Sequence, residues 1–87
     1  MARVKIYSTG SCPYCERAKS LLTRLGIAYD EVRVDLDRAG LKEMLAATNH
    51  ARTVPQIIVD GRHVGGFMEL TELHMDGGLD ALLPVKT

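Results

Sequence analysis

Two cysteines separated by two residues, in the run Cys12-Pro13-Tyr14-Cys15, have the type and spacing needed for redox chemistry. They are the only cysteines among the 87 residues of the chain. A pair this close can cycle between a dithiol and a disulfide within one small protein. The spacing therefore predicts thiol–disulfide exchange.

The positions of the two thiols predict different roles for them. Pro13 suits the first turn of a helix, where its missing N–H is no loss, so Cys12 is expected at the helix N-terminus. Free backbone N–H groups and the helix dipole favour an anion there, and the pKa of Cys12 should fall below the usual value of about 8.5. Cys15 lies one turn further in and should be more buried. We therefore expect Cys12 to attack and Cys15 to resolve the mixed disulfide.

Two other roles are open to the cysteine pair. A structural zinc site with this spacing normally has a second pair of ligands, whereas His50, His63 and His74 are scattered without ligand spacing. Inert cysteines are the second alternative, and the proline between them and the helix pattern behind them disfavour it. Redox chemistry is the preferred interpretation, and no metal is expected.

The bulk properties are those of an ordinary globular protein. The length predicts one domain spanning residues 1–87, and the formal net charge of zero gives no sign of the basic face of a nucleic-acid binder. Nothing near the N-terminus resembles a signal peptide, and no apolar run approaches the roughly 18 residues of a membrane span. We therefore expect a cytoplasmic protein, in a compartment where structural disulfides are rare.

Apolar periodicity places the cysteines between a strand and a helix. Residues 3–8 alternate as a strand, and the helix that follows the cysteines should end near Gly26. Residues 29–35 alternate again as a second strand, with Val32 and Val34 directed inward. The apolar stripe of the first helix consists of Ala18, Leu21, Leu22 and Leu25.

A second helix and a hairpin follow. Asp37 can cap the helix, which has an apolar face. Residues 56–59 are expected to form a buried strand, and Asp60-Gly61 predicts a two-residue turn into a partner strand at residues 62–65. The face of the second helix consists of Leu41, Met44, Leu45 and Thr48.

Gly65-Gly66 opens a third helix with Leu70 and Leu73 inward, and Gly77-Gly78 ends it before a final turn at residues 79–83. The element order is therefore β-α-β-α-β-β-α. The strand–helix–strand unit implies a parallel pair with a right-handed crossover, to which the hairpin adds two antiparallel strands. With the first strand placed centrally, the pattern predicts an α/β fold of the thioredoxin-like type, a four-stranded mixed sheet flanked by helices.

Three motifs together, Cys12-Pro13-Tyr14-Cys15, Thr53-Val54-Pro55 and Gly65-Gly66, carry a family resemblance. At these distances the chain resembles the glutaredoxins, of the small bacterial dithiol type, over nearly its whole length. The resemblance implies a glutathione-dependent thiol–disulfide oxidoreductase, with glutathione as co-substrate and no metal. It also implies a monomer whose partners are glutathionylated or disulfide-bonded proteins, ribonucleotide reductase among them.

The resemblance also implies which residues contact glutathione. Pro55 resembles the cis proline of the family, which would turn the backbone of Val54 outward to pair with the tripeptide as an added strand. Gly66 and Phe67 would bind the γ-glutamyl carboxylate at a helix N-terminus. Each of three of these contacts has an equally compatible alternative. Tyr14 could be a plain surface aromatic, and Lys42 and Arg52 could be solvated charges. The expected contacts are Tyr14, Lys42, Arg52, Thr53, Val54, Pro55, Gly66, Phe67 and Met68.

The chain departs from the family pattern at two places. Many relatives follow the glycine pair with a small residue and then Asp or Ser, whereas this chain has Phe67 and Met68, and Met68 offers only a weak acceptor. Relatives often have a lysine three residues before the first cysteine, where this chain has Thr9. We therefore expect milder activation of Cys12 and weaker glutathione binding.

The sequence is also compatible with two rival functions. One is a glutaredoxin-like protein that thioredoxin reductase reduces, which the change at Met68 leaves possible. The other is an iron–sulfur carrier in which Cys12 and glutathione ligate a cluster between two subunits. With Pro13 after the first cysteine, the chain resembles the members of the family that usually do not bind a cluster.

Overall fold

The strand that leads to the cysteines, β1 (Val4–Ser8), lies inside a four-stranded sheet with the order β2-β1-β3-β4. The computed structural model describes residues 3–82. β1 pairs in parallel with β2 (Tyr29–Arg33) and antiparallel with β3 (Gln56–Val59), which in turn pairs antiparallel with β4 (Arg62–Gly65). The predicted mixed sheet, with the first strand in its interior, is confirmed.

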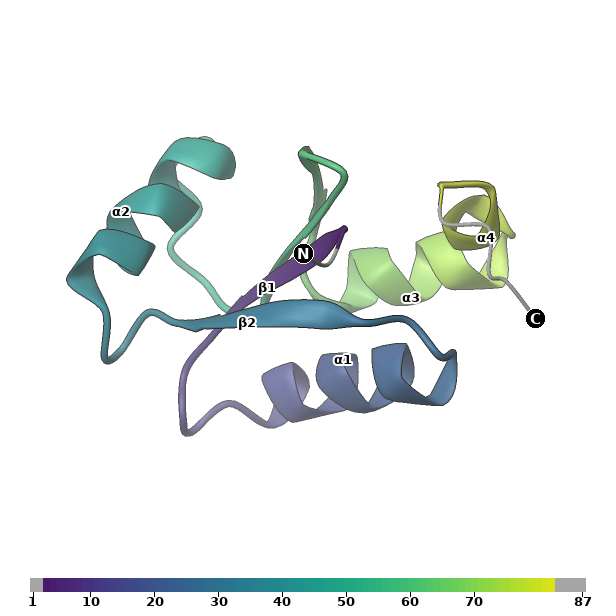
Figure 1. Cartoon of the computed structure of the whole chain (residues 1–87), viewed down its shortest axis with the longest axis horizontal. Helices are drawn as coiled ribbons and strands as arrows, with labels where there is room; N and C mark the ends of the chain where they lie inside the picture. Colours follow the sequence, from purple (N-terminus) through teal and green to yellow (C-terminus); the bar gives the residue numbers. More distant parts are fainter. Residues whose placement is uncertain (1–2, 83–87) are drawn as a thin grey trace.

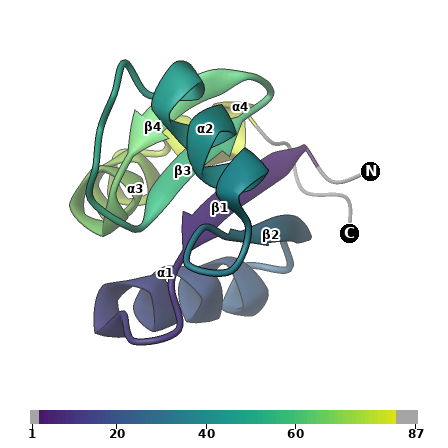
Figure 2. The same ribbon diagram turned by 90° about the vertical axis from the view of Figure 1, so that its left-hand side faces the viewer.

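Helices cover both faces of this sheet. α1 (Pro13–Arg24) and α2 (Arg38–Ala47) lie on opposite sides of β2, and α3 (Phe67–Met75) runs on the α1 side (Figures 1 and 2). A short helix, α4 (Gly78–Leu82), follows α3 and replaces the predicted final turn, of which residue 83 lies outside the described residues. The architecture is the thioredoxin-like fold expected from the sequence.

Alternation along the strands divides the core into two layers. Val4 and Ile6 of β1 face one layer, formed with α1, α3 and α4, while Tyr7 faces the other, formed with α2. Burying a side chain such as Leu22 of α1 contributes about 1.5–3 kcal/mol to folding stability. The two layers therefore hold the helices on each face against the sheet. The first layer contains Val4, Ile6, Ala18, Leu22, Ile57, Val59, Leu70 and Leu79, and the second contains Tyr7, Met44 and Ile58.

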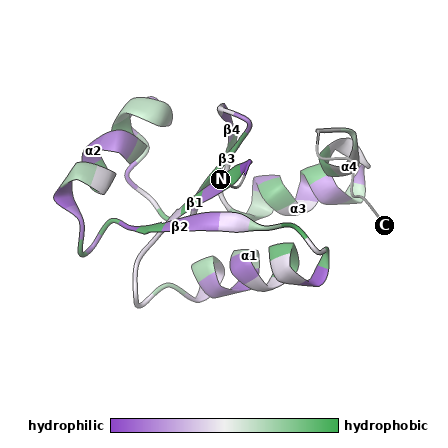
Figure 3. Cartoon of the chain, in the orientation of Figure 1, coloured by the Kyte–Doolittle hydropathy of each residue, from purple (hydrophilic) through white to green (hydrophobic). Residues whose placement is uncertain are grey.

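The edge strand β2 is polar and shorter than the sequence predicts. Its middle is hydrophilic (Figure 3), which suits a sheet edge that must not pair with another chain. The strand ends at Arg33 instead of Asp35, because the N–H groups of Leu36 and Asp37 both bond back to the Arg33 carbonyl, at 3.1 and 3.0 Å. The chain therefore turns into α2 two residues early, and Asp37 caps α2 as predicted.

The helices of the described chain are short. The longest, α1, has 12 residues. Among residues 3–82, no helix combines the length and apolar character needed to cross a bilayer.

Candidate active site

The cysteine pair lies where β1 ends and α1 begins. Cys12 is the N-cap of α1, and its Sγ accepts a hydrogen bond from the backbone N–H of Cys15 at 3.1 Å. Pro13 occupies the first helical turn, and the Glu16 N–H bonds to the Cys12 carbonyl at 3.1 Å. A sulfur atom at this point receives an N–H donor and the positive end of the helix dipole, so the geometry stabilises a Cys12 thiolate.

The two thiols differ in accessibility as predicted. Cys12 is half-buried, whereas Cys15 has no exposed surface. The structure presents the oxidised pair, joined by a disulfide with a Cα–Cα distance of 5.1 Å. Cys12 can therefore meet a partner sulfur, while Cys15 can reach only Cys12.

A cis proline lies beside the dithiol. The Val54–Pro55 peptide bond is cis, which confirms the expectation for Pro55, and the carbonyl oxygen of Val54 lies 3.7 Å from Cys12 Sγ. The side chain of Gln56 holds this loop, since its Nε2 donates to the Thr53 carbonyl at 3.0 Å and to the Thr53 hydroxyl at 3.2 Å. Backbone groups of the loop are thus positioned against the reactive sulfur.

The N-terminus of α3 forms the opposite wall. Gly66 is its N-cap, and a Cβ placed there would lie 3.4 Å from the carbonyl oxygen of Pro55, so the helix end lies close to the proline loop. The first N–H groups of any helix have no intrahelical partner. One of them is occupied here, because the carboxylate of Glu69 accepts from the Gly66 N–H at 2.8 Å. Within residues 3–82, the N–H groups of Phe67 and Met68 have no such side-chain partner.

Between these walls lies a shallow pocket of about 180 Å³. Seven of the nine residues predicted to contact glutathione line it, together with Glu69, which was not on that list. Lys42 on α2 and Arg52 before the proline loop are exposed and are not part of its lining. The lining residues are Tyr14, Thr53, Val54, Pro55, Gly66, Phe67, Met68 and Glu69.

Sequence reasoning missed an aromatic contact at the mouth of this pocket. The rings of Tyr14 and Phe67 lie 5.9 Å apart between centroids, and the guanidinium of Arg17 lies 5.3 Å from the centroid of the Tyr14 ring. The i, i+3 spacing of Tyr14 and Arg17 on a helix is a signal that could have predicted this second contact. The stacking links α1 to α3 across the dithiol.

The loop before Cys12 is held by the turn that follows β2, another contact that sequence reasoning missed. Asp35 Oδ2 accepts from the Gly10 N–H at 3.1 Å and pairs with Arg33 through both carboxylate oxygens. Hydrogen bonding from Arg33 lowers the pKa of Asp35 to about 2. The turn that shortens β2 therefore brings an anchor to the active-site loop.

A polar network lies under α1, between the helix and β2. Lys19 Nζ lies 2.9 Å from carboxylate oxygens of both Glu16 and Glu31, and the hydroxyl of Ser8 donates to Glu31 at 2.5 Å. The Ser8 hydrogen bond and then the Lys19 hydrogen bond lower the pKa of Glu31. Among the described residues, no group of three or more His, Cys, Asp or Glu side chains is arranged to hold a metal ion.

A disulfide at a helix N-terminus, a cis proline beside its Cys12 sulfur and a mixed sheet with helices on both faces define a thiol–disulfide oxidoreductase of the thioredoxin-like fold. The family model described as Glutaredoxin matches residues 4–64. The chain belongs to the glutaredoxin family.

Relatives and solved structures agree with this assignment. Glutaredoxin 3 of Escherichia coli strain K12 is 45% identical over 83 residues, which cover 95% of this chain and 99% of that protein. Glutaredoxin of Neisseria meningitidis serogroup B is 44% identical over 84 residues, covering 95% and 98%.

Among solved structures, a buckwheat glutaredoxin–glutathione complex has a TM-score of 0.84 at 32% identity, covering 95% of this chain and 77% of that chain. Glutaredoxin from Brucella melitensis has a TM-score of 0.78 at 40% identity, covering 95% and 89%. These relatives are matched over nearly the whole of this chain.

Proposed function

We propose that this chain uses glutathione to reduce glutathionylated and disulfide-bonded proteins, with Cys12 as the nucleophile and Cys15 as the resolving thiol. The observation that carries the proposal is that the Val54 backbone and the N-terminus of α3 line one pocket, and that the Val54 carbonyl oxygen also lies 3.7 Å from the sulfur of the half-buried Cys12. Such a site offers a thiol, an extended backbone edge and anion-binding N–H groups. Glutathione, a tripeptide thiol with two carboxylates, matches each of these three features.

Removal of glutathione from a protein needs Cys12 alone. The Cys12 thiolate attacks the glutathione sulfur of the mixed disulfide, and the protein thiolate leaves and takes up a proton. Glutathione is then held on Cys12 as a new mixed disulfide. A second glutathione thiolate attacks the sulfur of the bound glutathione, which forms glutathione disulfide and regenerates the Cys12 thiolate.

Reduction of a protein disulfide needs both thiols. Cys12 attacks one sulfur of the substrate and displaces the other as a thiolate, and Cys15 then attacks Cys12 and displaces the first. Two electrons pass to the substrate, which leaves as a dithiol, and the protein is left as the Cys12–Cys15 disulfide seen in the structure. Two molecules of glutathione return it to the dithiol.

The pocket supports the expected mode of glutathione binding with one modification. The Val54 carbonyl lies beside Cys12, which supports strand-like pairing of the Val54 backbone with the tripeptide, and the N–H groups of Phe67 and Met68 at the start of α3 would bind a carboxylate. The Glu69 carboxylate already occupies the Gly66 N–H. We therefore infer binding that is weaker than a fully open helix N-terminus would give.

The turnover of a glutathionylated peptide tests the proposal. In the presence of glutathione, glutathione reductase and NADPH, we expect steady consumption of NADPH that depends on the protein and on Cys12. The same peptide with thioredoxin reductase in place of glutathione and its reductase is the control. Faster turnover with thioredoxin reductase would overturn the proposal. It would favour the rival function, a glutaredoxin-like protein that thioredoxin reductase reduces. The Glu69 contact and the exposed Met68 side chain are the observations that favour this rival.

The proposal also includes the oligomeric state, the cellular compartment and a protein substrate. The residues that resemble a small dithiol glutaredoxin imply a monomer in the cytoplasm, with ribonucleotide reductase as one protein substrate. An iron–sulfur carrier would instead dimerise and develop a visible absorption band after anaerobic reconstitution with iron and sulfide. Sedimentation and absorption spectra after reconstitution separate these two states.

A further inference from the structure

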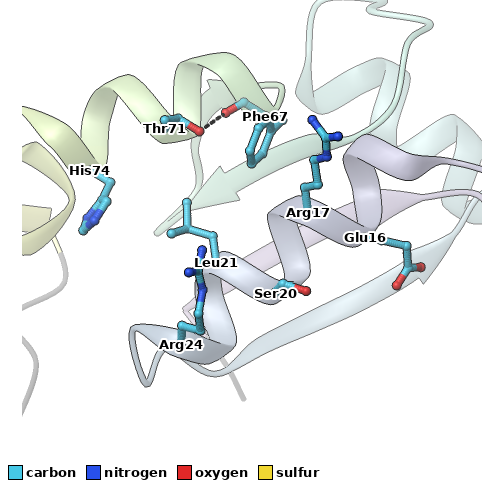
Figure 4. A pocket seen from close by; sticks show the side chains of 8 residues that line it. All are labelled: Glu16, Arg17, Ser20, Leu21, Arg24, Phe67, Thr71 and His74. Carbon is cyan, nitrogen blue, oxygen red and sulfur yellow. Dashed lines mark hydrogen bonds between the residues drawn. The ribbon is translucent and has the colours of Figure 1, made fainter.

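A second depression lies between α1 and α3, beside the pocket next to the dithiol. It has a volume of about 380 Å³, and Phe67 belongs to the lining of both depressions. Its floor is apolar, formed by Leu21 and Phe67, while Arg17 and Arg24 rise from α1 at its edge (Figure 4). We call this depression the α1–α3 groove.

The α1–α3 groove has an excess of positive charge. Neither Arg17 nor Arg24 forms an ion pair with another described residue, although Arg17 lies over the Tyr14 ring. Glu16, the one acidic residue of the lining, pairs with Lys19 at 2.9 Å and points away from α3 in Figure 4. The two guanidinium groups thus face the groove without a neutralising carboxylate.

A third group in the groove lacks a partner. Nδ1 of His74, on α3, is buried and has no hydrogen-bond partner within residues 3–82. The hydroxyl of Thr71 is already used, since it donates to the Phe67 carbonyl at 2.9 Å (Figure 4). The buried Nδ1 is therefore a polar atom beside the groove that the described residues leave unsatisfied.

We propose that the α1–α3 groove docks an acidic segment of the disulfide-bonded protein substrate, with one aliphatic or aromatic side chain on Leu21 and Phe67. This inference rests on the proposed reduction of protein disulfides. Arg24 lies about 18 Å along the helix axis from Cys12, because each residue rises about 1.5 Å. An extended chain covers that distance in about five or six residues, so the docked segment flanks the substrate cysteine in sequence.

The charge of the groove determines the preferred substrate. Opposite charges across an interface raise the rate of encounter, and salt screens the attraction between exposed groups. An acidic flank should therefore be reduced faster than a basic flank, and the difference should shrink as the salt concentration rises. Uncharged small disulfides do not reach Arg24, so the groove should not affect their rate of reduction.

The test uses four synthetic peptides, each with an intramolecular disulfide and a flank joined to it by a short Gly-Ser spacer. The flank is either Asp-Leu-Glu or Lys-Leu-Lys, and each flank is placed on one side of the disulfide or on the other. The fully reduced protein is mixed with one peptide in a single turnover, without glutathione, and the reduced peptide is separated by chromatography. We expect the acidic peptide to react about three- to tenfold faster than the basic one in at least one orientation.

Arg24→Glu should abolish or invert this ratio, and Arg62→Glu is the matched control. Arg62 begins β4, at the end of β3 opposite to Pro55, and should leave the ratio unchanged. Because the ratio is measured within each variant, a general loss of folding or of thiol reactivity cancels. The rate with 2-hydroxyethyl disulfide reports that reactivity separately.

Three results would overturn the docking proposal. They are a ratio near one in the wild type, a ratio unchanged by Arg24→Glu, and a concentration-dependent dimer that Arg24→Glu dissociates, which would assign the groove to a second copy. The single turnover contains no glutathione. A failure of glutathione-dependent turnover would thus refute the proposed function without affecting this measurement.

Discussion

The carboxylate of Glu69 accepts a hydrogen bond from the Gly66 N–H at 2.8 Å, at the helix end that lines the pocket beside the dithiol. A side chain of the protein thus occupies one of the donors that an anionic ligand would use. The contact also stabilises α3, because it satisfies an N–H group that the helix cannot. We therefore expect helix stability and glutathione binding to compete at this point.

Replacing Glu69 should therefore improve glutathione binding and weaken the fold. In Glu69→Ala, the Gly66 N–H becomes available and a negative charge is removed, so we expect the KM for glutathione to fall about two- to fivefold. The free energy of unfolding should fall by about 0.5–1.5 kcal/mol. Steady-state kinetics and urea unfolding measure the two effects. Glu69→Gln keeps a hydrogen-bond acceptor without the charge, and an unchanged KM in both variants would show that Glu69 does not compete.

Met68 offers a second way to strengthen glutathione binding. Its side chain is 64% exposed and lies in the lining of the same pocket, but a thioether cannot accept strongly from the α-amino group of glutathione. Met68→Asp should lower the KM for glutathionylated peptide about three- to tenfold, as a charged acceptor is gained. Met68→Leu, which adds no acceptor, should leave it within about twofold. Equal KM values for Met68→Asp and Met68→Leu would show that the α-amino group of glutathione does not bind beside residue 68.

The two cysteines should separate the two reactions. Cys15→Ser keeps the accessible Cys12, so it should retain the removal of glutathione from peptides within about an order of magnitude and lose protein disulfide reduction. Cys12→Ser should lose both, because the buried Cys15 cannot reach a substrate. Parallel assays with a glutathionylated peptide and a disulfide-bonded protein check this. Retained disulfide reduction in Cys15→Ser would contradict the assigned roles.

Asp35 should make the active-site loop sensitive to strong acid. Its pKa is lowered from 3.8 to about 2, mainly by Arg33, so its contribution to folding is complete above about pH 3.8 and disappears as the pH falls through 2. We expect the Gly10 amide resonance to shift with a midpoint near pH 2, since that N–H donates to Asp35. Asp35→Asn should abolish the transition. A midpoint near 4 in the wild type would show that the Arg33 pair does not persist in solution.

Gly65 should tolerate substitution less well than Gly26, another glycine with positive φ. Its φ is +123°, and a Cβ there would lie 2.9 Å from Glu69 Cγ. Gly26 has φ of +74° and open space around it. We expect Gly65→Ala to cost about 2–3 kcal/mol of unfolding free energy and Gly26→Ala about 1–2 kcal/mol. Urea unfolding compares them, and equal costs would indicate that Glu69 moves aside freely.

The sequence predicted the features that depend on local pattern and on motif. The strand before Cys12, the helix after it and the cap at Asp37 follow from periodicity and from residue type, and each is found. The cis bond at Pro55 and the greater burial of Cys15 were also expected. The predicted end of β2 at residue 35 was wrong, because a turn bonded to the Arg33 carbonyl competes with strand alternation.

The sequence by itself determined the chemistry of this protein, because two thiols at a helix start are defined by spacing along one segment. Only the tertiary structure decided the contacts that hold the active-site loop and join the helices beside it. Asp35 reaches Gly10 from the turn after β2, Phe67 meets Tyr14 across two helices, and the α1–α3 groove exists only where those helices pack. Contacts between distant segments depend on the summed packing of the whole chain, and no local pattern encodes them.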